Sequence, residues 1–134
     1  MNGHQLMLFG MSYLLLDFVW LSSSTPFLYQ PQFMKIQGKP LSLNKGYAVM
    51  AYVLLLFTLL SICIPLCTHY SKTHPSIVFA MVGLSIYGIF NMTNAAVLRN
   101  YELKTCVVDT LWGIFSFATM GLMYNVMKDL DRQS

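Results

Sequence analysis

Long apolar runs alternate with short polar segments along the chain. A helix that crosses a bilayer needs about 20 mostly apolar residues, and four runs reach that length. Residues 54–57 are apolar without interruption, so the period-two alternation of a barrel strand is missing. Because backbone groups in hydrocarbon must be satisfied within their own segment, the runs predict helices. The expected transmembrane helices cover residues 6–27, 47–68, 75–98 and 105–127.

Short connections between these runs predict an all-α integral membrane bundle that runs up, down, up and down as one domain, residues 1–134. Pro26 and Pro65 stand near the ends of the first two runs, where we expect each to kink or end its helix. Residues 28–46 form the one long connection. We expect residues 32–37 within it to form a short amphipathic turn on the membrane surface.

Composition strengthens this interpretation. Hydrophobic residues make up 56% of the 134 residues and charged residues 10%, whereas soluble domains carry roughly 25% charged residues. An ordinary soluble enzyme and a disordered tail are therefore excluded. The net charge of +3 is spread between connections without a basic block, so we expect no nucleic-acid partner. Three cysteines inside apolar runs argue against a disulfide framework.

Lysine and arginine counts give an orientation. The first and third connections carry five of these residues, and the other side carries three. Because cytoplasmic loops are enriched in lysine and arginine, we expect the first and third connections in the cytoplasm of a multi-pass protein. Which membrane the protein occupies is left open.

Two carboxylates interrupt the apolar runs. Asp17 lies in the first run and Asp109 in the last, and each is followed three residues later by a tryptophan, Trp20 or Trp112. An aspartate at the centre of a membrane helix costs roughly 2.5–3.5 kcal/mol. Such groups therefore face the interior of the bundle, where they find partners or a wet cavity.

The third run adds a polar stripe of Tyr87, Asn91 and Asn94 at helical spacing. At 1.5 Å per residue, these side chains and both aspartates lie about 6–15 Å below the same membrane face. We therefore expect one intramembrane polar site. Its members are Asp17, Asn91, Asn94 and Asp109, its walls are Tyr13, Trp20, Tyr87 and Trp112, and its mouth holds Arg99 and Lys104.

Each of these residues also fits a structural role. Tryptophans anchor helices at membrane interfaces, and asparagines hydrogen-bond neighbouring helices. Asp109 is close enough to a helix start to be a solvated carboxylate of the first turn. Asp17 has one such alternative, a structural hydrogen bond to the asparagines.

Three stretches carry a family resemblance. Residues 87–99 (YGIFNMTNAAVLR), 108–113 (VDTLWG) and 16–21 (LDFVWL), with Phe27-Leu28-Tyr29, resemble the predicted membrane proteins catalogued as domain of unknown function 2177. The resemblance covers nearly the whole chain and implies a small integral membrane protein of four helices. It brings no known reaction. The family pattern carries aspartate where this chain has Asn91, which removes one ionisable group from the expected site.

Three functions remain open. The favoured one is transport or binding of a proton or small polar solute by Asp17 and Asp109, in a chain that is small for a transporter unless it forms a homo-oligomer. The second is a non-catalytic membrane scaffold or partner subunit. The third, an enzyme that modifies a lipid, is the least favoured. We expect no cofactor and no bound metal, and the lipid bilayer is the one partner that the composition requires.

Overall fold

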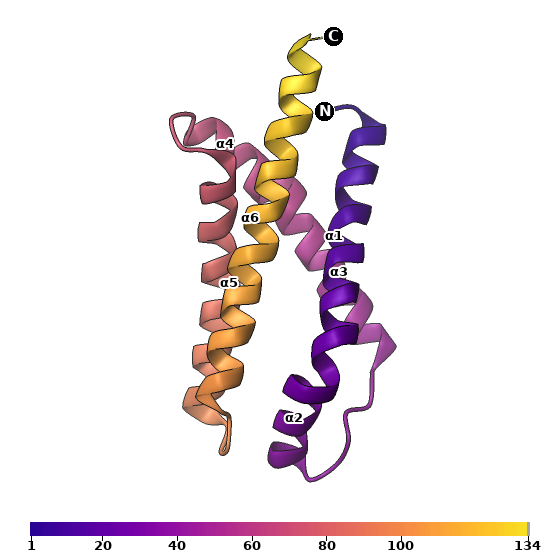
Figure 1. Cartoon of the computed structure of the whole chain (residues 1–134), viewed down its shortest axis with the longest axis vertical. Helices are drawn as coiled ribbons and strands as arrows, with labels where there is room; N and C mark the ends of the chain where they lie inside the picture. The colour runs from indigo at the N-terminus through magenta and orange to yellow at the C-terminus, as the bar shows by residue number, and fades with distance from the viewer. Residues whose placement is uncertain (134) are drawn as a thin grey trace.

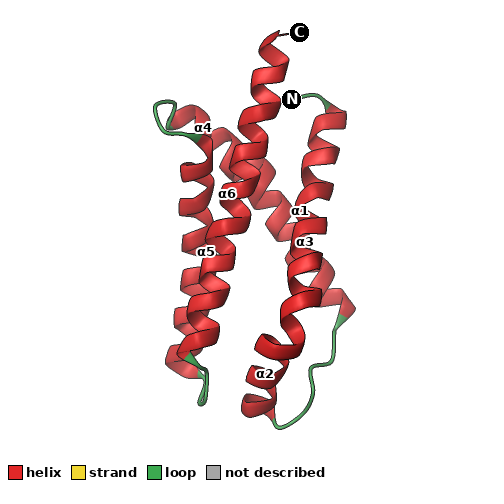
Figure 2. Ribbon diagram, viewed as in Figure 1, coloured by secondary structure: helices red, strands yellow, loops and turns green. Residues whose placement is uncertain are grey.

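The computed structural model describes residues 1–133, which form helices joined by short connections, with no strand among them (Figures 1 and 2). Four continuous helical segments are long and apolar enough to cross a membrane. They cover Gly3–Gln37, Lys45–His69, Pro75–Val97 and Leu103–Gln133. The expected all-α fold with four membrane helices is therefore confirmed.

The first segment is longer than the sequence suggested. It joins α1 (Gly3–Ser24), η1 (Thr25–Tyr29) and α2 (Gln30–Gln37). Pro26 does not end the helix near residue 27. The turn around it widens to π geometry, so that the amide of Gln30 bonds the carbonyl of Thr25. A widened turn accommodates the proline ring and its missing N–H without breaking the helix. Residues 32–37, expected as a surface turn, belong to α2.

The second segment also contains a π-helical turn next to a proline. It joins α3 (Lys45–Phe57), η2 (Thr58–Cys63) and α4 (Ile64–His69). The π-helical η2 lies just before Pro65 and bends the segment while the helix continues. In Figure 1 this segment crosses behind the others at an angle, and none of the described α3 side chains is buried within the protein.

Close packing joins α5 (Pro75–Val97) to α6 (Leu103–Gln133), which lie side by side in Figure 1. A Cβ on Gly83 would lie 2.3 Å from the carbonyl oxygen of Gly113, and one on Gly121 would lie 2.5 Å from the Cα of Ser76. The absence of side chains at these positions lets the two backbones touch. Gly88 plays no such part, because its nearest neighbouring atom would be 3.7 Å away.

The apolar core occupies the end of the bundle near the two termini and α4. Phe9 packs edge-on against Phe79, and Tyr13 packs in the same manner against Phe117. Leu59 and Cys63 of η2 complete this core. The polar groups therefore gather in the other half, towards α2 and the α5–α6 connection, which lie at the same end of the bundle in Figure 1.

A buried glutamine fastens α2 to that connection. Gln32 donates from Nε2 to the carbonyl of Asn100 at 2.8 Å, and its Oε1 accepts from the Glu102 amide at 2.9 Å and from the Thr105 hydroxyl at 3.0 Å. Lys35 adds an ion pair with Glu102. These contacts hold the π-helical turn η1 against α6 and so place Tyr29 near Asp109.

Candidate functional site

Asp17 is held between α3 and α6. The residue is 5% exposed. The Trp112 indole donates to Oδ1 at 2.9 Å, and the Tyr52 hydroxyl donates to Oδ2 at 2.9 Å. The expected partners of Asp17 were asparagines of the third helix, and the hydrogen bonds instead come from a tryptophan and a tyrosine.

Asp109 has a separate set of partners. The residue is 7% exposed. The Asn91 amide of α5 donates to Oδ2 at 2.7 Å, and the Tyr29 hydroxyl of η1 donates to Oδ1. Asp109 is therefore an interior group that joins three segments, rather than a solvated carboxylate of the first helical turn.

Two stacked tryptophans connect the two carboxylates. The rings of Trp20 and Trp112 lie 4.5 Å apart and 5° from parallel. Trp112 donates to Asp17, while Trp20 donates at 3.0 Å to the hydroxyl of Tyr29, which in turn donates to Asp109. The stacked tryptophans thus link to both carboxylates, but within residues 1–133 no single side chain hydrogen-bonds to both Asp17 and Asp109.

The donors around Asp109 suit its ionised form. An indole N–H can only donate, so the Tyr29 oxygen accepts from Trp20 and its own hydrogen goes to Asp109. The Asn91 nitrogen also donates to the carbonyl of Tyr87 at 2.9 Å, which fixes the orientation of the amide. Both oxygens of Asp109 therefore meet donors. A protonated carboxyl group would direct its own hydrogen at one of them.

Asp17 is less constrained. The indole of Trp112 can only donate, but the hydroxyl of Tyr52 is able to donate or accept. The contact between Asp17 and Tyr52 can therefore be made with either group as the donor. Among residues 1–133, neither Asp17 nor Asp109 forms an ion pair with a cationic side chain.

Tyr101 completes the polar network from the α5–α6 connection. Its hydroxyl donates at 2.7 Å to Oδ1 of Asn91. Burial raises the pKa of the Tyr101 phenol above its usual value, so the group stays a neutral donor at physiological pH. Both the amide nitrogen and the amide oxygen of Asn91 are therefore hydrogen-bonded, which fixes the side chain towards Asp109.

The remaining residues of the expected site are scattered. Asn94 is half-buried and interacts with Tyr101 rather than with a carboxylate. Tyr13 and Tyr87 pair their hydroxyls at 3.3 Å beside the network. Arg99 and Lys104, expected at the mouth, are both exposed.

Sequence reasoning missed three tyrosines that belong to the site. Tyr29, Tyr52 and Tyr101 come from η1, α3 and the α5–α6 connection. Each lies in or beside an apolar run, where a phenol has to find a hydrogen-bond partner. The position of each tyrosine in or beside an apolar run was the signal that the sequence offered, but it could not identify the hydrogen-bond partner of the phenol.

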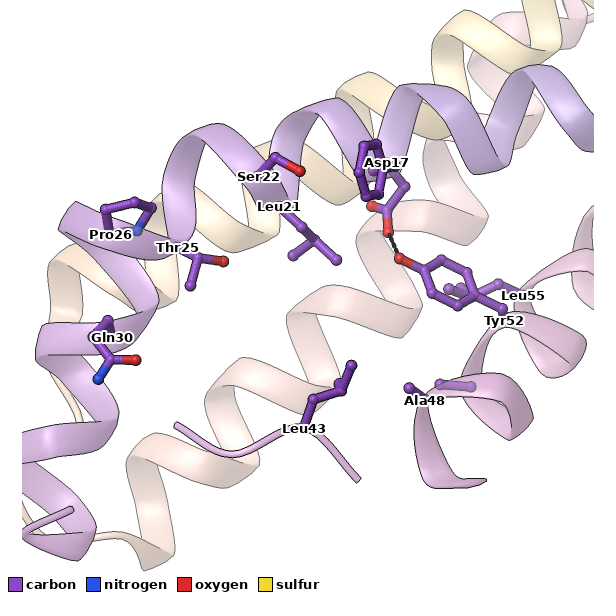
Figure 3. A pocket seen from close by; sticks show the side chains of 12 residues that line it. Asp17, Leu21, Ser22, Thr25, Pro26, Gln30, Leu43, Ala48, Tyr52 and Leu55 are labelled. Carbon is purple, nitrogen blue, oxygen red and sulfur yellow. Dashed lines mark hydrogen bonds between the residues drawn. The ribbon is translucent and has the colours of Figure 1, made fainter. Parts of the chain in front are cut away.

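Two adjoining clefts reach the carboxylates. The lateral cleft, of about 890 Å³, lies between α1 and α3 and has Asp17 and Tyr52 at one end (Figure 3). The central cleft, of about 680 Å³, lies among all four segments and has Asp109 in its wall. Leu21, Ala51 and Leu55 line both clefts. Within the described chain, Arg99 and Lys104 line neither of them.

Side chains on the outer surface of the bundle contribute to the lining of both clefts. Phe18, at the edge of the lateral cleft, is 65% exposed on the outer surface of the bundle. Leu54 and Phe90 stand at the edge of the central cleft and are 58% and 55% exposed. In a membrane these outward positions face lipid, so a molecule dissolved in the bilayer can reach the clefts directly.

A membrane-length bundle of four helical segments with two buried carboxylates defines a class of small multi-pass integral membrane protein. The chain belongs to the family described as Predicted membrane protein (DUF2177), whose model matches residues 4–125. This confirms the resemblance carried by the aspartate–tryptophan and asparagine motifs. Comparison with curated proteins finds no match, and neither does comparison with solved structures.

Proposed function

We propose that this protein binds a proton or small polar solute at Asp17 and Asp109 and carries it across the membrane. The observation that supports this function best is the pair of carboxyl groups, each more than nine-tenths buried and neither paired with a cation. Ionisable groups inside membrane helices are costly and commonly mark solute or proton pathways.

The two carboxylates have different tasks in this proposal. Asp17 exchanges a proton, because Tyr52 can donate to its ionised form and accept from its protonated form. Asp109 is the binding carboxylate, because donors from Tyr29 and Asn91 face both of its oxygens and favour its ionised form.

The stacked indoles of Trp20 and Trp112 separate the two groups. An indole N–H donates but does not accept, so it passes no proton along a hydrogen-bonded chain. Transport therefore requires the tryptophan pair to move or a water molecule to bypass it. We accordingly propose carrier-like turnover with a gated step rather than an open pore.

The test is proton flux into dye-loaded liposomes that contain the purified protein. We expect flux above that of empty liposomes, and we expect Asp17→Asn and Asp109→Asn to abolish it. Asp129→Asn, at an exposed carboxylate near the end of α6, is the matched control and should retain flux. A lack of flux at every imposed membrane potential would remove proton transport.

A scaffold function is the second candidate, because internal donors satisfy the oxygens of both carboxylates. In that function the network fixes how the helices fit together. It predicts that Asp17→Asn lowers thermal stability or changes assembly in detergent while flux is absent in every variant. Flux that Asp17→Asn abolishes in a folded protein would contradict it.

A further inference from the structure

We propose that the central cleft binds a lipophilic organic cation, with its charged group beside Asp109 and its apolar body between α3 and α5. This inference rests on the proposed function and names a substrate class for the same site. It follows from the charge of the site, the chemistry of its walls and the direction from which it is entered.

Charge is the first argument. Asp109 is suited to the ionised form by donors at both oxygens, yet no cationic side chain among residues 1–133 pairs with it. A buried anion without a counter-ion attracts a positively charged ligand, because their interaction is weakly screened away from water. A carboxylate has about four lone-pair positions, so positions remain for such a ligand.

The side chains that line the central cleft suit a bare inorganic ion poorly. Calcium and magnesium require about six oxygen ligands, whereas leucine, isoleucine, phenylalanine and alanine make up seven of the twelve residues that line the central cleft. Three tyrosines and two phenylalanines also line it: Tyr29, Tyr87, Tyr101, Phe33 and Phe90. Aromatic surfaces attract organic cations, and aromatic cages recognise quaternary ammonium groups.

The route into the central cleft and the volume of the cleft both agree with a lipophilic organic cation. Leu54 and Phe90 line the cleft and are also exposed on the outside of the spanning segments, so we expect this side of the cleft to meet lipid. A volume of about 680 Å³ lies within the range of small-molecule sites. A ligand that arrives through lipid has an apolar body, and Leu54, Leu55 and Ile86 offer that body a matching surface.

Tetraphenylphosphonium is the probe that tests the proposal. It carries a permanent charge, and tetraphenylborate has nearly the same shape with the opposite charge. We would measure binding of each by equilibrium dialysis against the full-length protein in lipid nanodiscs, with empty nanodiscs as the baseline. We expect saturable binding of the phosphonium and none of the borate above the baseline.

Two variants test the location in the central cleft. Asp109→Asn removes the charge and should weaken phosphonium binding by more than about tenfold. Ala51→Phe fills the cleft while leaving Asp109 in place, and should weaken binding as strongly. The matched controls are Asp129→Asn and Val53→Phe. Val53 is an exposed α3 position outside the cleft lining, and both controls should bind as the unaltered protein does.

Circular dichroism in the indole region, where the stacked rings of Trp20 and Trp112 absorb, shows which variants remain folded. A variant that loses binding because it unfolds is thereby distinguished from one that loses the binding site. Binding no greater than that of empty nanodiscs overturns the inference, even where liposomes pass protons. Equal binding of the borate, or unchanged binding by folded Asp109→Asn, overturns it as well. Phosphonium binding by a protein that passes no proton would contradict proton transport and leave the ligand class standing.

Discussion

Trp20 and Trp112 stack with their ring centres 4.5 Å apart and their planes within 5° of parallel. One ring belongs to α1 and the other to α6, and each donates its N–H into the hydrogen bonds of a different carboxylate. The pair is therefore one of the contacts that join the first and last segments, and it separates the two carboxylates of the site.

The tryptophan pair predicts a spectroscopic signature. The chain contains only these two tryptophans, and two indoles this close couple their electronic transitions. We expect an exciton couplet in the circular dichroism of the indole region, and we expect Trp20→Phe or Trp112→Phe to remove it. Phe115→Leu, at an exposed ring beside Trp112, should leave the couplet in place. A spectrum equal to the sum of the two single variants would contradict the stacking.

Two glycines of α5 provide a matched pair for helix packing. In Gly83→Ala the new methyl group would meet the Gly113 carbonyl, so we expect a destabilisation of about 1–3 kcal/mol. Gly88→Ala meets only ordinary contacts and should be neutral or stabilising by up to about 1 kcal/mol, because alanine favours helices over glycine. Thermal unfolding in detergent measures both. Equal effects of the two variants would contradict the close approach of α5 and α6.

Gln32 is expected to control the attachment of α2. Gln32→Ala leaves the part-buried Glu102 amide and the buried Thr105 hydroxyl without their acceptor. This should cost about 1–3 kcal/mol and speed amide hydrogen exchange at Glu102 and across α2. Met34→Ala, at an exposed position of the same helix, is the control. Exchange at Glu102 that is equally slow in both variants would show that Gln32 does not hold the two segments together.

Replacing Asn91 by aspartate gives a test of the site. Asn91→Asp places a second carboxyl group at hydrogen-bonding distance from Asp109, where the Asn91 amide now lies at 2.7 Å. Two carboxylates this close cannot both stay ionised, so we expect the pair to share one proton. Infrared spectroscopy should then show a protonated carboxyl band.

The band should vanish when Asp109→Asn is added to Asn91→Asp, because a single carboxylate is left beside an amide. Asn125→Asp, which lies in α6 near the termini beside Asp129, should produce no buried carboxyl band. If Asn91→Asp shows only ionised carboxylates, then the two side chains do not meet as the structure has them.

The sequence by itself determined the four spanning helices and the helical stripes that turn the polar groups inward. Helix formation in a bilayer depends on a local property, an apolar stretch of about 20 residues that satisfies its own backbone. The aspartate–tryptophan spacing of three residues likewise placed Asp17 with Trp20, and Asp109 with Trp112, on one face of each helix. Both pairs take part in the observed network.

The tertiary structure decided which side chains satisfy which carboxylate. Trp112 reaches the aspartate of the opposite helix, and Tyr29, Tyr52 and Tyr101 supply donors that spacing along the chain did not assign. These pairings depend on how far each helix is rotated about its axis and on the widened turn at Pro26 that carries α1 into α2. Rotation is set by contacts between helices, such as the close approach of α5 and α6 at Gly83 and Gly113, and apolar patterning within one segment leaves it undetermined.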